Sequence, residues 1–160
     1  MTDNMLLGQA GVYFVAGELS RRGYIALVTT RNTKSYDILA YNPAAKRNLQ
    51  LQIKSTKQRH KDSDNDDYIV LTTNQDALEE KLQSIESYHV FVYFPKGGHP
   101  RYFVTPPKEL QDIVREAWND YIEHTKHRKG IEDIKKAQNP IGPWIGQLKK
   151  YENRWDLLET

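Results

Sequence analysis

Apolar and polar residues alternate most clearly along two runs, Tyr36–Asn42 and Arg47–Thr56, in this chain of 160 residues. Period-two alternation is typical of a β-strand with one buried face, and the proline-containing loop between the runs predicts a hairpin. In the register that pairs Asn42 with Arg47, one face of the hairpin is entirely apolar, carrying Ile38, Ala40, Leu49, Leu51 and Ile53. This face is expected to point at the core.

Apolar residues at helical spacing predict a first helix over Asn4–Arg22, ended by Gly23. The residues at this spacing are Leu6, Leu7, Ala10, Tyr13, Phe14, Gly17 and Arg21. Further strands are expected at Tyr24–Thr29, Tyr68–Thr72, His89–Phe94 and Arg101–Val104, and further helices at Asp76–Ser84, from Pro107 with Thr105 as its cap, and at Ile131–Ala137. This order predicts an α/β fold, a mixed β-sheet flanked by helices in a single domain.

The last residues, 139–160, lack a clear period and are expected to form an irregular segment packed on the domain of residues 1–138. Three aromatic side chains are predicted to hold this segment in place, namely Trp144, Tyr151 and Trp155.

The amino-acid composition excludes several kinds of site and partner. The chain has no cysteine, which excludes disulfides, cysteine-ligated zinc and iron–sulfur clusters. The formal net charge is only +2, so a nucleic-acid partner has to be held by a local basic patch. No apolar run has the length of a membrane helix and no signal peptide is visible, so we expect a cytoplasmic protein with no membrane partner.

The polar face of the predicted hairpin carries the candidate chemistry. Asp37 lies opposite Gln52, and Lys54 follows on the same side. A hard divalent cation prefers oxygen ligands, which the Asp37 carboxylate, the Gln52 amide and the Ile53 carbonyl can supply. Lys54 can then orient or deprotonate a water molecule, or offset the charge that builds up on a phosphate. On spacing alone, an amphipathic hairpin with a merely solvated outer face explains the same pattern.

Asp37 followed by Gln52-Ile53-Lys54, after apolar Leu49 and Leu51, resembles the signature of the PD-(D/E)xK, or restriction-endonuclease-like, nucleases. The Q-x-K form resembles that of the Mrr-type enzymes. The resemblance covers about Leu7 to Ser55 and implies DNA as substrate, Mg²⁺ or Mn²⁺ as cofactor, and a catalytic set of Asp37, Gln52, Lys54 and Glu18. It also implies that Glu18, on the first helix, shares the metal. Tyr36 stands where the signature usually has proline, and Gln52 removes one negative charge from the site.

Basic residues lead away from this hairpin. Lys57, Arg59 and Lys61 follow within a few residues and are candidates for contacts with phosphates, although such a run is also common in a solvated loop. His124 and His127 have the spacing of two metal ligands on a helix, but a helix C-terminus attracts cationic side chains without any metal, which is the simpler explanation.

Three functions follow from these observations. The first is a Mg²⁺-dependent endonuclease that hydrolyses phosphodiester bonds, which as a double-strand cutter would need a homodimer. The second is a nuclease-fold module with a weakened site that binds nucleic acid or a protein. The third is an interaction domain with no nucleic-acid role.

Overall fold

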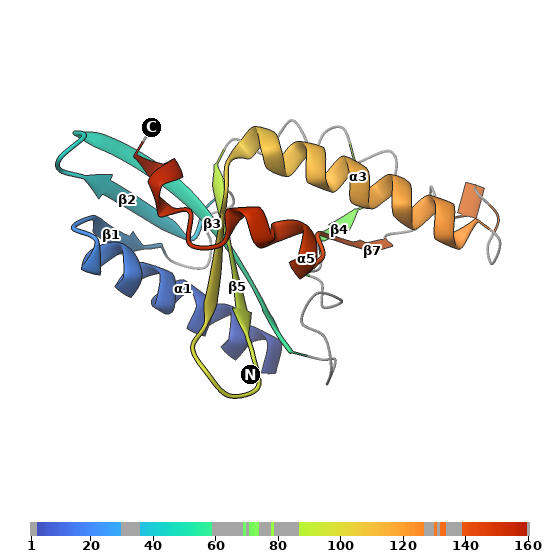
Figure 1. Cartoon of the computed structure of the whole chain (residues 1–160), viewed down its shortest axis with the longest axis horizontal. Helices are drawn as coiled ribbons and strands as arrows, with labels where there is room; N and C mark the ends of the chain where they lie inside the picture. Colours follow the sequence, from blue (N-terminus) through green and yellow to red (C-terminus); the bar gives the residue numbers. More distant parts are fainter. Residues whose placement is uncertain are drawn as a thin grey trace.

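The computed structural model describes residues 3–29, 36–58, 69, 71–73, 78, 87–126, 130, 132–133 and 139–159. Its centre is a five-stranded sheet in the order β1-β2-β3-β5-β6 (Figure 1). The strands are β1 (Ile25–Val28), β2 (Ile38–Asn42), β3 (Arg47–Lys57), β5 (Tyr88–Phe94) and β6 (Arg101–Thr105). All neighbours are antiparallel except β3 and β5, which run parallel, so the predicted mixed sheet is confirmed.

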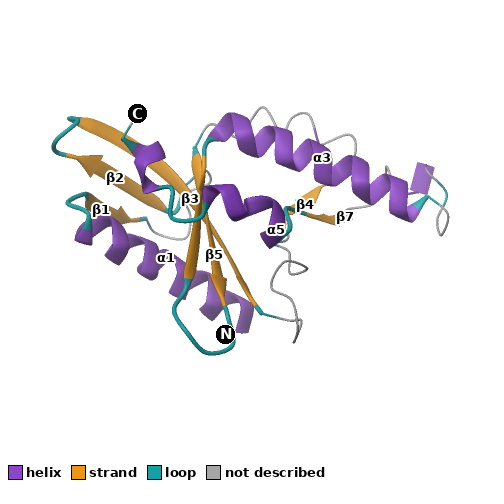
Figure 2. Ribbon diagram, viewed as in Figure 1, coloured by secondary structure: helices purple, strands orange, loops and turns teal. Residues whose placement is uncertain are grey.

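Helices lie on both sides of this sheet (Figure 2). Helix α1 (Asp3–Arg21) packs Val15 and Leu19 against the inner faces of β2 and β3. Helix α3 (Pro107–Thr125) packs Leu110, Val114 and Trp118 against Phe91 and Phe103 on the other face. The expected α/β class with flanking helices is therefore confirmed.

The register of the β2–β3 hairpin is the predicted one. Asn42 pairs with Arg47 and Ile38 with Leu51, and the five apolar residues expected on the inner face are all buried. The Asn42 side chain accepts hydrogen bonds from the backbone N–H groups of Ala44 and Ala45, which closes the turn between the strands.

Helix α1 exists as predicted, but the residues it buries are not the ones that marked it by their spacing. The residues it buries are Gly11, Val15 and Leu19, whereas Leu6, Tyr13 and Phe14 are exposed. The physical reason is the close approach at Gly11, where an added Cβ would lie 1.9 Å from the Ser55 hydroxyl oxygen. A helix can come this near to β3 only with its small residues inward, which turns its larger apolar side chains outward.

The start of α3 also differs from the prediction. Pro106 occupies the N-cap position and no side chain caps the helix. Thr105 belongs to β6, and its buried hydroxyl oxygen has no hydrogen-bond partner. The two prolines suffice to start the helix because their fixed φ suits its first turn.

Residues 139–159 are more regular than predicted. They form β7 (Asn139–Ile141), α5 (Ile145–Leu148) and two 3₁₀ turns, η1 (Lys149–Tyr151) and η2 (Trp155–Leu158). Strand β7 pairs with β4 (Leu71–Thr73) in a separate two-stranded sheet. Tyr151 and Trp155 are buried as expected, whereas Trp144 is 43% exposed.

The expected strand at Tyr68–Thr72 overlaps β4, and Tyr68 and Val70 lie outside the described residues. The helices predicted at Asp76–Ser84 and Ile131–Ala137 fall mostly outside the described residues as well. None of the helices in the described part of the chain combines the length and the apolar character needed to cross a lipid bilayer.

A bidentate ion pair joins the C-terminal segment to β6. Arg101 donates to both carboxylate oxygens of Glu152, at 2.7 and 2.9 Å. Hydrogen bonding to Arg101 is the main reason why the pKa of Glu152 lies below its ordinary value of 4.5. A lowered carboxyl pKa stabilises the fold above that ordinary value, and this contribution is lost as the pH falls through the lowered pKa.

We therefore expect Glu152→Gln to reduce the free energy of unfolding by about 1 kcal/mol at pH 7, as for a well-formed, partly exposed ion pair. The difference between wild type and variant should shrink as the pH falls below 4.5 and vanish once the pH lies below the lowered pKa, because Glu152 is then protonated in both states. Urea unfolding at pH 7 and over a series of acidic pH values measures this. A difference that does not change with pH would mean that the effect comes from packing rather than charge.

Candidate active site

Asp37 is fixed by backbone hydrogen bonds on both sides, directly before β2. Its N–H donates to the Leu51 carbonyl at 2.9 Å, and its carbonyl accepts the Thr29 N–H, also at 2.9 Å. The Thr29 hydroxyl donates to the same region, to the carbonyls of Tyr36 and Asp37. The position of the Asp37 side chain is therefore set by β1 and β3 together.

The Asp37 carboxylate holds two donors from β3. Its Oδ2 accepts the Gln52 side-chain amide and the Ile53 backbone N–H, each at 2.7 Å. Such short distances are typical of hydrogen bonds to an ionised acceptor. The expected juxtaposition of Asp37 and Gln52 is confirmed, and the Gln52 amide is oriented with its nitrogen toward Asp37, which directs Oε1 elsewhere.

These residues lie along an open cleft of about 590 Å³ between α1 and the edge of the hairpin. The cleft is lined on the sheet side by Val28, Thr29, Asp37, Gln52, Ile53 and Lys54, and on the helix side by Asn4, Met5, Gly8, Gln9, Val12 and Tyr13. Lys54 alternates with Gln52 on β3 and is half-buried. The structure thus brings Asp37, Gln52, Ile53 and Lys54 together.

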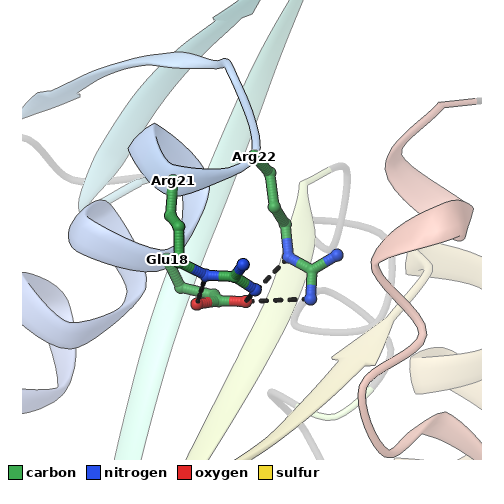
Figure 3. Close-up of polar contacts among 3 residues, drawn as sticks. All are labelled: Glu18, Arg21 and Arg22. Carbon is green, nitrogen blue, oxygen red and sulfur yellow. Dashed lines mark hydrogen bonds and ion pairs between the residues drawn. The ribbon is translucent and has the colours of Figure 1, made fainter.

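Glu18 is not among the residues that line this cleft. Its carboxylate is bound by Arg21 and Arg22, with Arg–carboxylate distances of 2.8 Å (Figure 3). The hydrogen bonds from Arg21, and then those from Arg22, lower the pKa of Glu18. The nearest cleft residue on α1 is Tyr13, five residues before Glu18 and about 7.5 Å away along the helix axis.

Arg22 joins Glu18 to the C-terminal segment. Its guanidinium lies 5.1 Å from the ring centre of Trp155, which in turn packs on Tyr102. Burial, and then the charge of Glu18, raise the pKa of Tyr102. Glu18 therefore serves an ion pair and aromatic cluster that closes the other end of α1, not the cleft.

The donor set in the cleft fits one weakly held, hard divalent cation. The Asp37 carboxylate and the Ile53 carbonyl are oxygen ligands of the kind Mg²⁺ and Mn²⁺ prefer, and Gln52 can add its amide oxygen only by turning its amide group over. Among the described residues no group of three or more His, Asp or Glu side chains is placed to bind a metal. One carboxylate still suits Mg²⁺, which commonly keeps several waters and completes its shell with substrate phosphates.

Of the basic residues proposed for phosphate contacts, Lys57 is exposed at the end of β3. Arg59 and Lys61 lie outside the described residues, as does His127. His124 contacts the Asp120 carbonyl of its own helix at 2.8 Å, as expected for a residue near a helix C-terminus.

Sequence reasoning missed the contribution of α1 to the cleft. Gln9 and Tyr13 lie one turn apart on the wall facing Asp37, and the Gln9 amide donates to the Tyr13 hydroxyl oxygen at 3.4 Å. The signal that could have identified them is Gly11, because a glycine between larger residues marks where a helix approaches a strand. Residues on either side of that contact then flank it.

No protein-family model and no curated protein matches the sequence. Among solved structures, the chain is similar to Hjc, a Holliday junction resolvase from the archaeal hyperthermophile Archaeoglobus fulgidus. The two share 18% sequence identity over 65% of this chain and 80% of that one, with a TM-score of 0.38. A likeness this distant carries no argument about the activity of this chain.

Proposed function

We propose that this protein is a nuclease that hydrolyses phosphodiester bonds of DNA with Mg²⁺ or Mn²⁺. The observation that carries the proposal is the Asp37 carboxylate, bound at Oδ2 by Gln52 and the Ile53 N–H, in the same cleft as Lys54. The resemblance of these residues to the PD-(D/E)xK signature supports it, in the Q-x-K form.

Each residue has a distinct task in this proposal. Asp37 would hold the cation, with the Ile53 carbonyl as a neutral ligand, and Gln52 would add Oε1 only after its amide turns over and gives up the hydrogen bond to Asp37. The hydrogen bonds from Gln52 and Ile53 keep the Asp37 carboxylate oriented before the cation and substrate bind. The Lys54 ammonium offsets charge developing on the phosphate oxygens, or holds the attacking water. The bound cation supplies Lewis-acid polarisation of the phosphoryl group.

The decisive test is the nicking of supercoiled plasmid DNA in Mg²⁺ or Mn²⁺, compared with EDTA. Nicking that requires the cation and is lost in an Asp37 variant supports the proposal. Absence of cleavage of any DNA with either metal contradicts it.

A second candidate is a binding module with the same fold, and the charge of the cleft favours it. Among the described residues that line the cleft, Asp37 is the only carboxylate. This candidate predicts DNA retention that weakens steeply with salt and no cleavage under any metal condition.

Gln52→Glu tests whether a cation binds beside Asp37, as the nuclease candidate requires. The substitution replaces the donor to Asp37 by a second carboxylate, which places like charges 2.7 Å apart at the present geometry. We expect Mn²⁺ to bind at least about tenfold more tightly, because a second negative charge acts at short range. Without metal, the repulsion should raise the pKa of one carboxyl group and make the fold less stable as the pH rises above about 5.

Calorimetric titration with Mn²⁺ and urea unfolding in EDTA measure the two effects. Gln52→Ala is the matched control, since it removes the same hydrogen bond without adding charge. Mn²⁺ binding that is equal in wild type, Gln52→Glu and Gln52→Ala would mean that no cation binds beside Gln52.

A further inference from the structure

The two walls of the cleft differ in chemistry. The sheet wall presents Asp37, Gln52 and Lys54, which suit a phosphate and its counterion. The helix wall presents Met5, Val12 and Tyr13 together with Val28 from β1, and of these Tyr13 is 58% and Met5 43% exposed. Hydrolysis of a phosphodiester bond needs only the polar wall, so the apolar wall requires a separate explanation.

The apolar wall is not a by-product of core packing. Helix α1 packs on the sheet through Gly11, Val15 and Leu19, which directs Tyr13 into the cleft rather than into the core. The Gln9 side chain donates to the Tyr13 hydroxyl oxygen, which steadies the ring from the preceding turn. An exposed aromatic ring beside a polar site is the arrangement used to stack a base.

We propose that the helix wall binds an unpaired nucleobase next to the phosphate at the polar wall. The inference rests on the proposed function and names its substrate class, namely DNA with unpaired nucleotides at the cleavage step. A nucleotide matches the cleft because it joins an apolar, stackable base to an anionic phosphate, and Tyr13 and Met5 line the same cleft as Lys54.

Base pairing decides which substrates fit. In a duplex both faces of each base are covered by its neighbours, so Tyr13 can stack only on a base that is already unpaired or has been turned out of the helix. A cleft of about 590 Å³ is in the size range that encloses a small molecule such as one nucleotide. The Gln9 amide oxygen adds an acceptor that can contact the base edge.

The test is equilibrium binding in EDTA, so that it does not depend on cleavage. Fluorescent single-stranded and fully paired oligonucleotides of equal length are compared, with 2-aminopurine in the single strand as a reporter of stacking. We expect wild type to prefer the single strand and to quench 2-aminopurine. Tyr13→Ala should weaken single-strand binding by about 5- to 100-fold and abolish the quenching, with little effect on duplex binding.

Two controls accompany this variant. Tyr13→Phe keeps the ring and should retain the preference. Leu6→Ala removes an equally exposed α1 side chain that does not line the cleft, and should behave as wild type.

Failure of this inference and failure of the proposed function look different. Metal-dependent cleavage without any preference for unpaired DNA overturns the base-binding wall and keeps the nuclease. Base stacking that depends on Tyr13, without any cleavage, supports the base-binding wall and contradicts the nuclease proposal. The inference is overturned if the protein binds single-stranded and paired DNA with equal affinity and Tyr13→Ala changes neither affinity. The helix wall would then be a candidate surface for a protein partner.

Discussion

Lys54→Ala should lose DNA cleavage by about 10²- to 10³-fold in Mg²⁺ or Mn²⁺ while it keeps its melting temperature. The loss is that expected when one preorganised electrostatic contact to a developing charge is removed. The fold should hardly change, because Lys54 is only half-buried and lies at an open cleft. Single-turnover cleavage and a thermal melt measure the two quantities.

Lys57→Ala is the matched control for Lys54. Lys57 lies three residues further along β3 and is exposed outside the cleft. Its loss should weaken DNA binding in a salt-dependent way and reduce the slope of log affinity against log salt concentration by about 1. The rate at which bound DNA is cleaved should stay nearly unchanged. If Lys54→Ala cleaves as fast as wild type, the site has been assigned to the wrong residues.

Asp37→Asn should reduce cleavage by about 10³-fold or more, because it removes the only carboxylate among the described lining residues. It should also lower the free energy of unfolding by about 1–2 kcal/mol, since the Gln52 and Ile53 donors lose an ionised acceptor. The side chain keeps its size, so these effects report charge rather than packing.

A thermal shift with Mn²⁺ separates binding from catalysis in this variant. Mn²⁺ should raise the melting temperature of the wild type, because it binds the folded state, and should not raise that of Asp37→Asn. An equal shift in both proteins would show that the cation binds away from Asp37, and the proposed metal site would then be wrong.

The hairpin could be predicted from sequence because its two faces differ so strongly. A slip of one residue between β2 and β3 would put the apolar side chains of the two strands on opposite faces, so that either Ile38 or Leu51 would be exposed, and the apolar pattern therefore leaves one register. That register places Asp37 opposite Gln52 without further information. The part of the cleft that comes from the hairpin was therefore predictable from alternation alone.

The part that comes from α1 was not predictable in the same way. Its large apolar residues suggested an inner face, yet Gly11 decides the packing because only a residue without Cβ fits against Ser55. The choice of Glu18 followed from family resemblance rather than from the orientation of the helix. Arg21 and Arg22 form ion pairs with Glu18 at the end of the same helix, so its carboxylate is not available to a metal. The i+3 and i+4 spacing of these residues shows this alternative in the sequence.

The sheet also has a consequence for the order in which the chain acquires structure. Every described residue that lines the cleft lies between Asn4 and Lys54, and β1, β2 and β3 pair with their neighbours in sequence. The parallel pairing of β3 with β5 instead joins distant residues, beginning with Leu51 and Tyr88, and must close a long loop first. Pairings of this kind form slowly, so substitutions in the β5–β6 half should mainly accelerate unfolding, whereas substitutions in the first hairpin should slow folding itself.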